Sequence, residues 1–343
     1  MKTGSRQEKN KGVVCKSMFD VASLASNQFV VIGRAGMDFY PEPPGTKTED
    51  ATQFYASLGG SSANICVAIQ KHGGQSSLVT CVSDDAVGRF CLKQLQQYGV
   101  DTTYVRSQDG EYRNSLAVSE SRVKDHQTVI YRNGAADFQM STDDIDTVDF
   151  SPYCALITTG TVLAAEPSRA AAFQAFELAK TKGLGLIFDI DYRPYSWATA
   201  EEAATVYSRA GALCDVIIGN DVEFGFMAGD YDKGLVKARE LAHSTASIVV
   251  YKMGEKGAIT ITADDEFKTG IYPVEALKPT GAGDSFMGGF IASLAGGYSI
   301  KESVLRGSAC ASMVVSRVGC APAMPTPSEL DTFLAANEIQ PTS

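Results

Sequence analysis

Apolar residues along this chain follow two spacings, one typical of buried strands and one typical of amphipathic helices. Short continuous apolar runs, which predict strands, occur at 29–32, 77–82, 155–158, 186–189, 216–219 and 247–252. Segments with helical periodicity occur at 90–98, 168–180, 200–212 and 235–244. Strands and helices that alternate in this way form right-handed β-α-β crossovers, so the pattern predicts a layered α/β fold with a parallel sheet.

One segment departs from this alternation. Between residues 104 and 132, two apolar runs at 116–118 and 128–131 are separated by polar residues and by no helical pattern. This pattern predicts short strands joined by polar turns.

A glycine-flanked turn at 278–286 carries the clearest chemical signal. Gly281 and Gly283 leave backbone N–H groups uncovered at the start of an expected helix, where unpaired donors and the helix dipole attract anions. Asp284 lies just inside that helix and is placed to take a proton from a hydroxyl that attacks phosphorus. Offsetting the helix dipole is the simpler role for such an Asp. The combination favours phosphoryl transfer to an alcohol.

Two further segments offer groups that recognise hydroxyls. Gly59 and Gly60 precede an apolar helix, and a glycine pair lets a ligand approach the backbone closely. Asn64 can donate to and accept from hydroxyls, and Asp38 follows the apolar run at 29–32, where open α/β sheets bind ligands. A tight helix entry with a capping residue would explain the glycines and Asn64 without a ligand. We expect these residues to bind a sugar.

These segments resemble the signatures of the PfkB (ribokinase-like) family of carbohydrate kinases. Residues 59–64 are similar to the first signature of that family and residues 278–286 to the second, while Asn220 and Glu223 match its Asn-x-x-Glu motif. The resemblance implies a three-layer α/β/α fold with a mostly parallel central sheet and a small β-strand lid.

The resemblance also implies a domain organisation. A kinase domain would cover residues 28–335 after an N-terminal extension over 1–27. Its lid would come from parts of 39–58 and 104–135. Lid strands of this family often pair between subunits, so a homodimer through the lid is expected.

The roles that the resemblance implies are those of an ATP-dependent sugar kinase. Asp284 would be the catalytic base, and the anion hole would be formed by Gly281, Ala282 and Gly283. Glu223 would act on Mg²⁺ indirectly, through water. The turn at 252–257 would contact ATP, although an ordinary glycine-containing hairpin would show the same sequence pattern. Residues implied to bind the nucleotide and its metal are Asn220, Glu223, Lys252, Gly254 and Gly257. A monovalent cation such as K⁺ is common among relatives.

The nature of the acceptor depends on two arginines. Arg193 follows an apolar run directly, in a segment that holds the only tryptophan, and such an Arg can pair bidentately with a substrate carboxylate. Arg132 belongs to the expected lid and could reach the same anion. Pairing of Arg193 with Asp189 or Asp191 would explain it without a substrate. Two arginines facing one site favour a sugar acid, as in the sugar-acid kinases of the family; ribose or fructose offers them no carboxylate.

Composition narrows the alternatives. The 343 residues, 44% of them hydrophobic, suffice for a sizeable core, and the net charge of −10 argues against a nucleic-acid partner. No apolar run approaches the roughly 20 residues needed to span a bilayer, and residues 1–20 lack a secretory apolar core, so we expect a cytoplasmic protein with no membrane partner. Eight cysteines without a Cys-x-x-Cys pair predict buried thiols. A non-catalytic sugar-binding regulatory protein is the alternative from another class.

Overall fold

The computed structural model describes residues 19–341 and is built around one large sheet. Its nine strands lie in the order β13-β12-β11-β10-β9-β8-β1-β4-β5. All neighbours pair in parallel except β11 with β12 and β12 with β13. The strands are β1 (Gln28–Ile32), β4 (Gln75–Ser83), β5 (Val105–Gln108), β8 (Ala155–Thr159), β9 (Gly185–Asp189), β10 (Val216–Asn220), β11 (Ile248–Lys252), β12 (Ala258–Thr262) and β13 (Glu266–Thr269).

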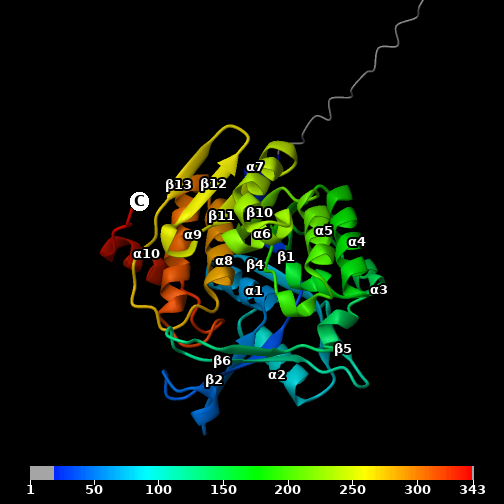
Figure 1. The fold of residues 1–343 in the computed structure, drawn as a ribbon. Helices are drawn as coiled ribbons and strands as arrows, with labels where there is room; N and C mark the ends of the chain where they lie inside the picture. The colour runs from blue at the N-terminus through cyan, green and yellow to red at the C-terminus, as the bar shows by residue number, and fades with distance from the viewer. Residues whose placement is uncertain (1–18, 342–343) are drawn as a thin grey trace, which may run out of the picture.

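Helices cover both faces of this sheet, as Figure 1 shows. Strand β1 illustrates why its residues are apolar throughout: Val30 and Ile32 pack into one core cluster, Phe29 and Val31 into the other, and all four are fully buried. One cluster includes residues of α3 (Thr142–Asp146), α4 (Ser168–Thr181), α5 (Ala200–Gly211), α6 (Asp221–Ala228) and α7 (Gly234–Ser244). The other includes residues of α1 (Ser61–Lys71), α2 (Ala86–Gln97), α8 (Ala282–Ala295) and α9 (Ile300–Val315).

A second, four-stranded sheet stands apart from this layered body, with β2 and β6 at the bottom of Figure 1. Its order is β3-β2-β6-β7, and we call it the lid sheet. The strands are β2 (Gly36–Pro41), β3 (Phe54–Gly59), β6 (Ser115–Ser119) and β7 (Thr128–Tyr131). Its β2 begins four residues after β1 ends, so the lid sheet is tied directly to the carboxyl end of a central strand.

The predicted fold class is confirmed, and the differences have local causes. Helix α2 begins at Ala86, four residues before the predicted start, because the Asp85 carboxylate accepts hydrogen bonds from the N–H groups of Val87 and Gly88. The short helix α6 and the antiparallel strands β12 and β13 were not predicted. Helix α6 starts at a capping box between Asn220 and Glu223, the motif that the sequence analysis had interpreted only as a metal and phosphate motif.

Both ends of the described chain pack against helices of the layered body. Of the predicted N-terminal extension over 1–27, residues 1–18 lie outside the described residues; the 3₁₀ helix at Val21–Ser26 contacts α8 and buries Leu24 completely. Near the other end, α10 (Pro327–Ala336) buries Leu330 in a small core cluster that also contains Cys310 of α9. Over residues 19–341, no helix has the length and apolar character that crossing a membrane requires.

Candidate active site

A cavity of about 1130 Å³ lies between the carboxyl ends of the central strands, the lid sheet and the start of α8. Ligands of open α/β sheets bind at this edge. The structure brings together most of the predicted site residues there: those that line the cavity are Asp38, Gly60, Asn64, Arg193, Asn220, Glu223, Lys252, Gly254, Gly257, Gly281, Ala282, Gly283 and Asp284. Gly59 and Arg132 are not among its lining residues.

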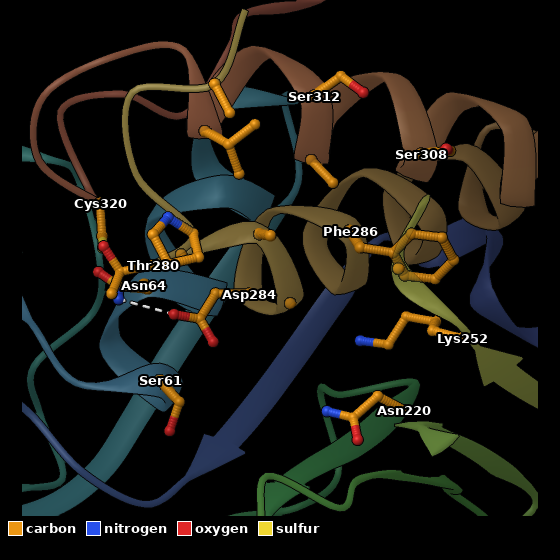
Figure 2. A pocket seen from close by; sticks show the side chains of 18 of the residues that line it. Ser61, Asn64, Asn220, Lys252, Thr280, Asp284, Phe286, Ser308, Ser312 and Cys320 are labelled. Carbon is orange, nitrogen blue, oxygen red and sulfur yellow. Dashed lines mark hydrogen bonds between the residues drawn. The ribbon is translucent and has the colours of Figure 1, made fainter. Parts of the chain in front are cut away.

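Asp284 lies in the first turn of α8 and is held by a residue from α1. The Asn64 side-chain amide donates a hydrogen bond of 2.8 Å to Oδ2 of Asp284, as Figure 2 shows. Asn64 is 3% exposed, and its Oδ1 has no hydrogen-bond partner in the described chain. One carboxylate oxygen of Asp284 is thereby positioned, and the free amide oxygen is available to a hydroxyl in the cavity.

The electrostatic environment raises the pKa of Asp284 to about 7. Burial is the largest cause, and the nearby Asp191 carboxylate acts in the same direction. The hydrogen bond from Asn64 and the charges of Arg193 and Arg34 act to lower it. A carboxyl group with such a pKa exchanges its proton at neutral pH, which is the property that a general base requires.

The turn before Asp284 has the backbone geometry of an anion-binding helix start. Gly281 occupies the N-cap of α8 with φ of 84°, in the left-handed region that favours glycine, and no side chain caps the first turn. A Cβ on Gly281 would come within 2.8 Å of Cys320 Sγ. On Gly283 it would meet nothing closer than Lys252 Nζ at 3.7 Å, so Gly283 faces open space. The N–H groups of this turn are accessible to an anion.

Asp38, on strand β2 of the lid sheet, forms the opposite part of the wall. The Tyr40 hydroxyl donates a 3.2 Å hydrogen bond to Oδ2 of Asp38. Burial raises the pKa of Asp38, although Arg34, Tyr40 and Lys278 oppose the shift. Gly59 has a packing role beside it, because a Cβ there would lie 2.0 Å from Asp38 Oδ1. The prediction that Gly59 itself contacts substrate stays a prediction.

Two arginines line the cavity, Arg193, which the sequence indicated, and Arg34, which it did not. Arg193 forms an ion pair with Asp191 at 2.6 Å, one of the two pairings that would explain this arginine without a substrate. Its side chain remains 42% exposed. Arg34, which follows β1, is 8% exposed; its Nη1 donates to Ser115 Oγ at 3.0 Å, and its Nε has no partner among the described residues. Sequence reasoning missed Arg34, although its position after a strand end was the signal that had indicated Asp38.

Arg132 lies apart from this pair. Its guanidinium binds the Asp137 carboxylate and donates to the Thr161 carbonyl at 3.0 Å, and it stacks on the Phe138 ring at 4.1 Å. These contacts bury Arg132 to 6% exposure. We expected Arg132 and Arg193 to face one anion. The structure arranges them differently, because the Asp137 carboxylate already neutralises Arg132. Direct contact of Arg132 with substrate would require that pair to break.

The comparisons with known proteins agree with this geometry. A family model described as "pfkB family carbohydrate kinase" matches residues 26–327. The chain belongs to the pfkB family of carbohydrate kinases. Among curated relatives, proteins named 5-dehydro-2-deoxygluconokinase from Photobacterium profundum and Geobacillus kaustophilus are 37% and 35% identical, over 90% and 89% of this chain and 95% and 93% of theirs.

Solved structures also match this chain over nearly their whole length. Fructokinase from Vibrio cholerae O395 is 25% identical with a TM-score of 0.78, over 90% of this chain and 98% of that one. Aminoimidazole riboside kinase from Salmonella enterica is 26% identical with a TM-score of 0.75, over 90% and 99%. This member of the pfkB family is an ATP-dependent sugar kinase.

The part of the cavity beyond Asp284 contains the residues that the sequence predicts to bind the nucleotide. Lys252, at the end of β11, places its Nζ over the Phe286 ring at 5.3 Å (Figure 2). Gly254 and Gly257 shape the following turn with φ of 57° and 80°. Further lining comes from residues 269–274 and from α9. Contacts of these residues with ATP stay predictions.

The residues around Glu223 suit a magnesium ion that is held largely through water. Glu223 is 7% exposed, and its Oε2 accepts a 2.7 Å hydrogen bond from the Asn220 backbone N–H. Burial raises the pKa of Glu223 and of Asp189, and neighbouring carboxylates raise that of Asp189 further, so a bound cation would favour the ionised form of both groups. In residues 19–341, no three or more His, Cys, Asp or Glu side chains form a group able to hold a metal. Mg²⁺ fits such a site, because it keeps several waters and binds through one or two carboxylates and substrate phosphates.

Proposed function

We propose that this kinase transfers the γ-phosphoryl group of ATP to the primary 6-hydroxyl of 5-dehydro-2-deoxy-D-gluconate, a sugar acid of inositol catabolism. The observation that carries the acid specificity is the pair Arg34 and Arg193 on the wall of the cavity that also contains Asp284. The buried Nε of Arg34 lacks a partner, and a substrate carboxylate would supply one. The names of the two curated relatives agree with this substrate.

The chemical step follows from the positions of the residues. Asp284 accepts the proton of the acceptor hydroxyl as the hydroxyl oxygen forms a bond to the γ-phosphorus, and the bond from phosphorus to the bridging oxygen breaks to release ADP. Asn64 orients Asp284 through the 2.8 Å hydrogen bond. The N–H groups at Gly281, Ala282 and Gly283 stabilise the charge on the transferred group. Mg²⁺, when bound, neutralises phosphate charge during the transfer.

Other acceptors define the alternatives. A kinase of 2-dehydro-3-deoxygluconate would use the same two arginines, whereas a ribokinase or fructokinase would leave them without an anion. A non-catalytic sugar-binding protein would have no need of a carboxylate whose pKa is raised to about 7.

The test is a turnover screen with ATP and Mg²⁺, in which ADP release is measured with 5-dehydro-2-deoxygluconate, 2-dehydro-3-deoxygluconate, ribose and fructose. We expect the highest kcat/KM with 5-dehydro-2-deoxygluconate and much lower values with both neutral sugars. Preference for ribose or fructose would refute the acid specificity and leave the kinase assignment standing. No ADP release with any acceptor would favour the regulatory protein.

We also propose that two copies pair through the lid sheet. Its edge strands expose Phe54 and Tyr55 on β3 and Val129 and Tyr131 on β7, with exposures between 40% and 62%. Exposed apolar side chains on strand edges suit pairing with a second copy. Light scattering should give twice the chain mass for wild type and a smaller mass for Tyr131→Lys.

A cytoplasmic location completes the proposal. The seven cysteines in the described part of the chain are free and buried. Thiols kept in this state suit a reducing compartment.

A further inference from the structure

Lys278 is a fully buried lysine that lies three residues before the glycine turn of the active site. It is 0% exposed and is among the largest fully buried side chains. Its Nζ donates to two backbone carbonyl oxygens, at 2.6 Å to Thr280 and 3.4 Å to Val314. No carboxylate in residues 19–341 lies within ion-pair distance of it. Buried lysines without a paired anion are rare, so this one needs a physical reason.

The two carbonyls come from the two segments that define the anion-binding turn. Val314 belongs to the last turn of α9, where the helix dipole favours a cation, and its carbonyl also accepts from the Arg317 N–H at 3.2 Å. The adjacent Val315 carbonyl accepts from the N–H groups of Leu277 and Lys278 at 2.7 and 3.1 Å. Thr280 directly precedes Gly281. The ammonium group therefore connects the end of α9 to the start of the turn.

The turn itself packs on the same end of α9. A Cβ on Gly281 would lie 3.1 Å from Val314 Cγ1 and 2.8 Å from Cys320 Sγ. A small displacement of this end would move the N–H groups that receive the phosphoryl group. The position of the anion hole thus depends on the contact that Lys278 holds.

The charge of Lys278 also reaches the reacting groups. Burial lowers its pKa, whereas Cys320 and the carboxylates of Asp38 and Asp284 favour the charged form. A cation behind the turn favours the ionised state of Asp284 and the negative charge of the transferred group.

Backbone carbonyl oxygens around a single positive charge are the ligands that a potassium ion takes. One solved relative, fructokinase from Vibrio cholerae, was crystallised with potassium bound. We propose that Lys278 is a tethered monovalent cation, a positioning residue whose ammonium holds the anion-binding turn against α9 and makes catalysis independent of added K⁺. The inference rests on phosphoryl transfer at Asp284 and not on which sugar accepts the phosphoryl group.

The first test uses wild-type protein and needs no variant. Turnover of the best acceptor from the screen is measured in KCl, NaCl and choline chloride at one ionic strength. We expect the three rates to agree within about twofold, because the cation is already covalently present. Activation by K⁺ of about tenfold or more over choline would overturn the proposal.

The second test removes the ammonium group. Lys278→Ala leaves the carbonyl oxygens and a space, and we expect kcat to fall roughly tenfold to a hundredfold, as for a lost charged hydrogen bond. K⁺ or NH₄⁺ should restore part of it, whereas choline should not. In Lys278→Met the side chain fills the space, so no cation should rescue it. A Lys278→Met enzyme with wild-type kcat would also overturn the proposal.

Lys71 provides a matched control. Its Nζ likewise donates to two backbone carbonyls, of Pro322 at 3.0 Å and Met324 at 2.7 Å, but neither carbonyl belongs to the glycine turn or to α9. Lys71→Ala should lower the melting temperature and leave kcat and its cation response unchanged. An equal loss of kcat in Lys71→Ala would reduce Lys278 to a stabilising contact.

Two further measurements separate a charge effect from loss of structure. Removing a positive charge makes ionisation of Asp284 harder, so the acidic limb of the kcat/KM profile should move to higher pH in Lys278→Met; Asp191, Arg193, Arg34 and Asn64 also face that carboxyl and stay unchanged. An unmoved acidic limb would contradict the charge role.

The second measurement needs no assay of activity. K⁺ should raise the melting temperature of Lys278→Ala more than choline does, with no such difference in wild type. That result would stand even if every proposed acceptor failed.

Discussion

The two walls of the active-site cavity are built in different ways. The wall that we propose for phosphoryl transfer comes from one contiguous turn and the first turn of α8, at residues 281–284. The acceptor wall is assembled from Arg34 after β1, Asp38 on the lid sheet, and Asp191 and Arg193 after β9. The first presents backbone N–H groups and one carboxyl; the second presents paired charges.

We expect the first wall to control the rate of the chemical step and the second wall to control the choice of acceptor. Asp284 has a pKa raised to about 7 because it is buried near Asp191, and such a group can exchange a proton at neutral pH. On the proposed acceptor wall, burial acts to raise the pKa of Asp191, but the charge of Arg193 helps to lower it, so that pair presents fixed charges to the cavity. We therefore expect changes on the first wall to reduce kcat for every acceptor, and changes on the second wall to alter kcat/KM for acids.

The largest effect should come from Asp284→Asn, which removes the proton acceptor with little change of shape. We expect kcat to fall by about 10²–10⁴ for all acceptors, with nucleotide binding retained. Rapid-quench turnover and calorimetric titration with ATP measure the two quantities. A variant that turns over near the wild-type rate would remove Asp284 from the mechanism.

Gly283→Val should have the next largest effect. Its side chain would occupy the open space in front of the turn and block access of an anion to the N–H groups, so kcat should fall by about 10²–10³. Gly283→Ala, whose Cβ meets only Lys252 Nζ at 3.7 Å, should lose less. Circular dichroism and thermal melting check that both fold. An active, correctly folded Gly283→Val enzyme would refute the anion hole.

The arginines should differ from each other on the acceptor wall. Arg34 is buried, with 8% of the residue exposed, so Arg34→Ala should lower kcat/KM for the acid roughly a hundredfold. Arg193 is only partly buried, with 42% of its side chain exposed, so Arg193→Ala should lower it roughly tenfold. Rates with ribose or fructose should change less. Arg193→Lys should also be deficient, because a point charge cannot replace the planar guanidinium.

Arg239→Ala is the matched control for Arg193→Ala. Arg239 is 43% exposed and pairs with Glu266 at 2.7 Å on the surface away from the cavity. It should leave all four rates unchanged. If both cavity variants treat acids as wild type does, the acceptor wall does not recognise a carboxylate.

The smallest effect should come from Asn64, which joins the two walls. In wild type, kcat/KM should rise with pH through about 7 as Asp284 loses its proton. Asn64→Ala removes a hydrogen bond that lowers this pKa, so the acidic limb of the kcat/KM profile should move to higher pH. At pH values above that limb, kcat/KM should fall by less than about tenfold. Asn64→Asp adds a carboxyl and should move the limb further. An unchanged limb in both variants would assign it to another group.

The sequence alone was sufficient wherever the relevant interactions are local. The α/β alternation follows from apolar spacing, because a strand buried on both faces must be continuously apolar, as β1 is. The anion-binding turn follows from its two glycines, because Gly281 adopts a φ of 84° that favours glycine and Gly283 leaves the space in front of the turn open.

Tertiary structure decided which distant charges meet. Arg132 and Arg34 look equally available along the chain, but folding places Asp137 against Arg132 and leaves Nε of Arg34 free at the cavity wall. Lys278 lay inside the recognised motif, but its role depends on Val314, 36 residues later, whose carbonyl it meets only when α9 packs beside α8. Charge partners depend on through-space distance and burial, and neither quantity is written in the local pattern of residues.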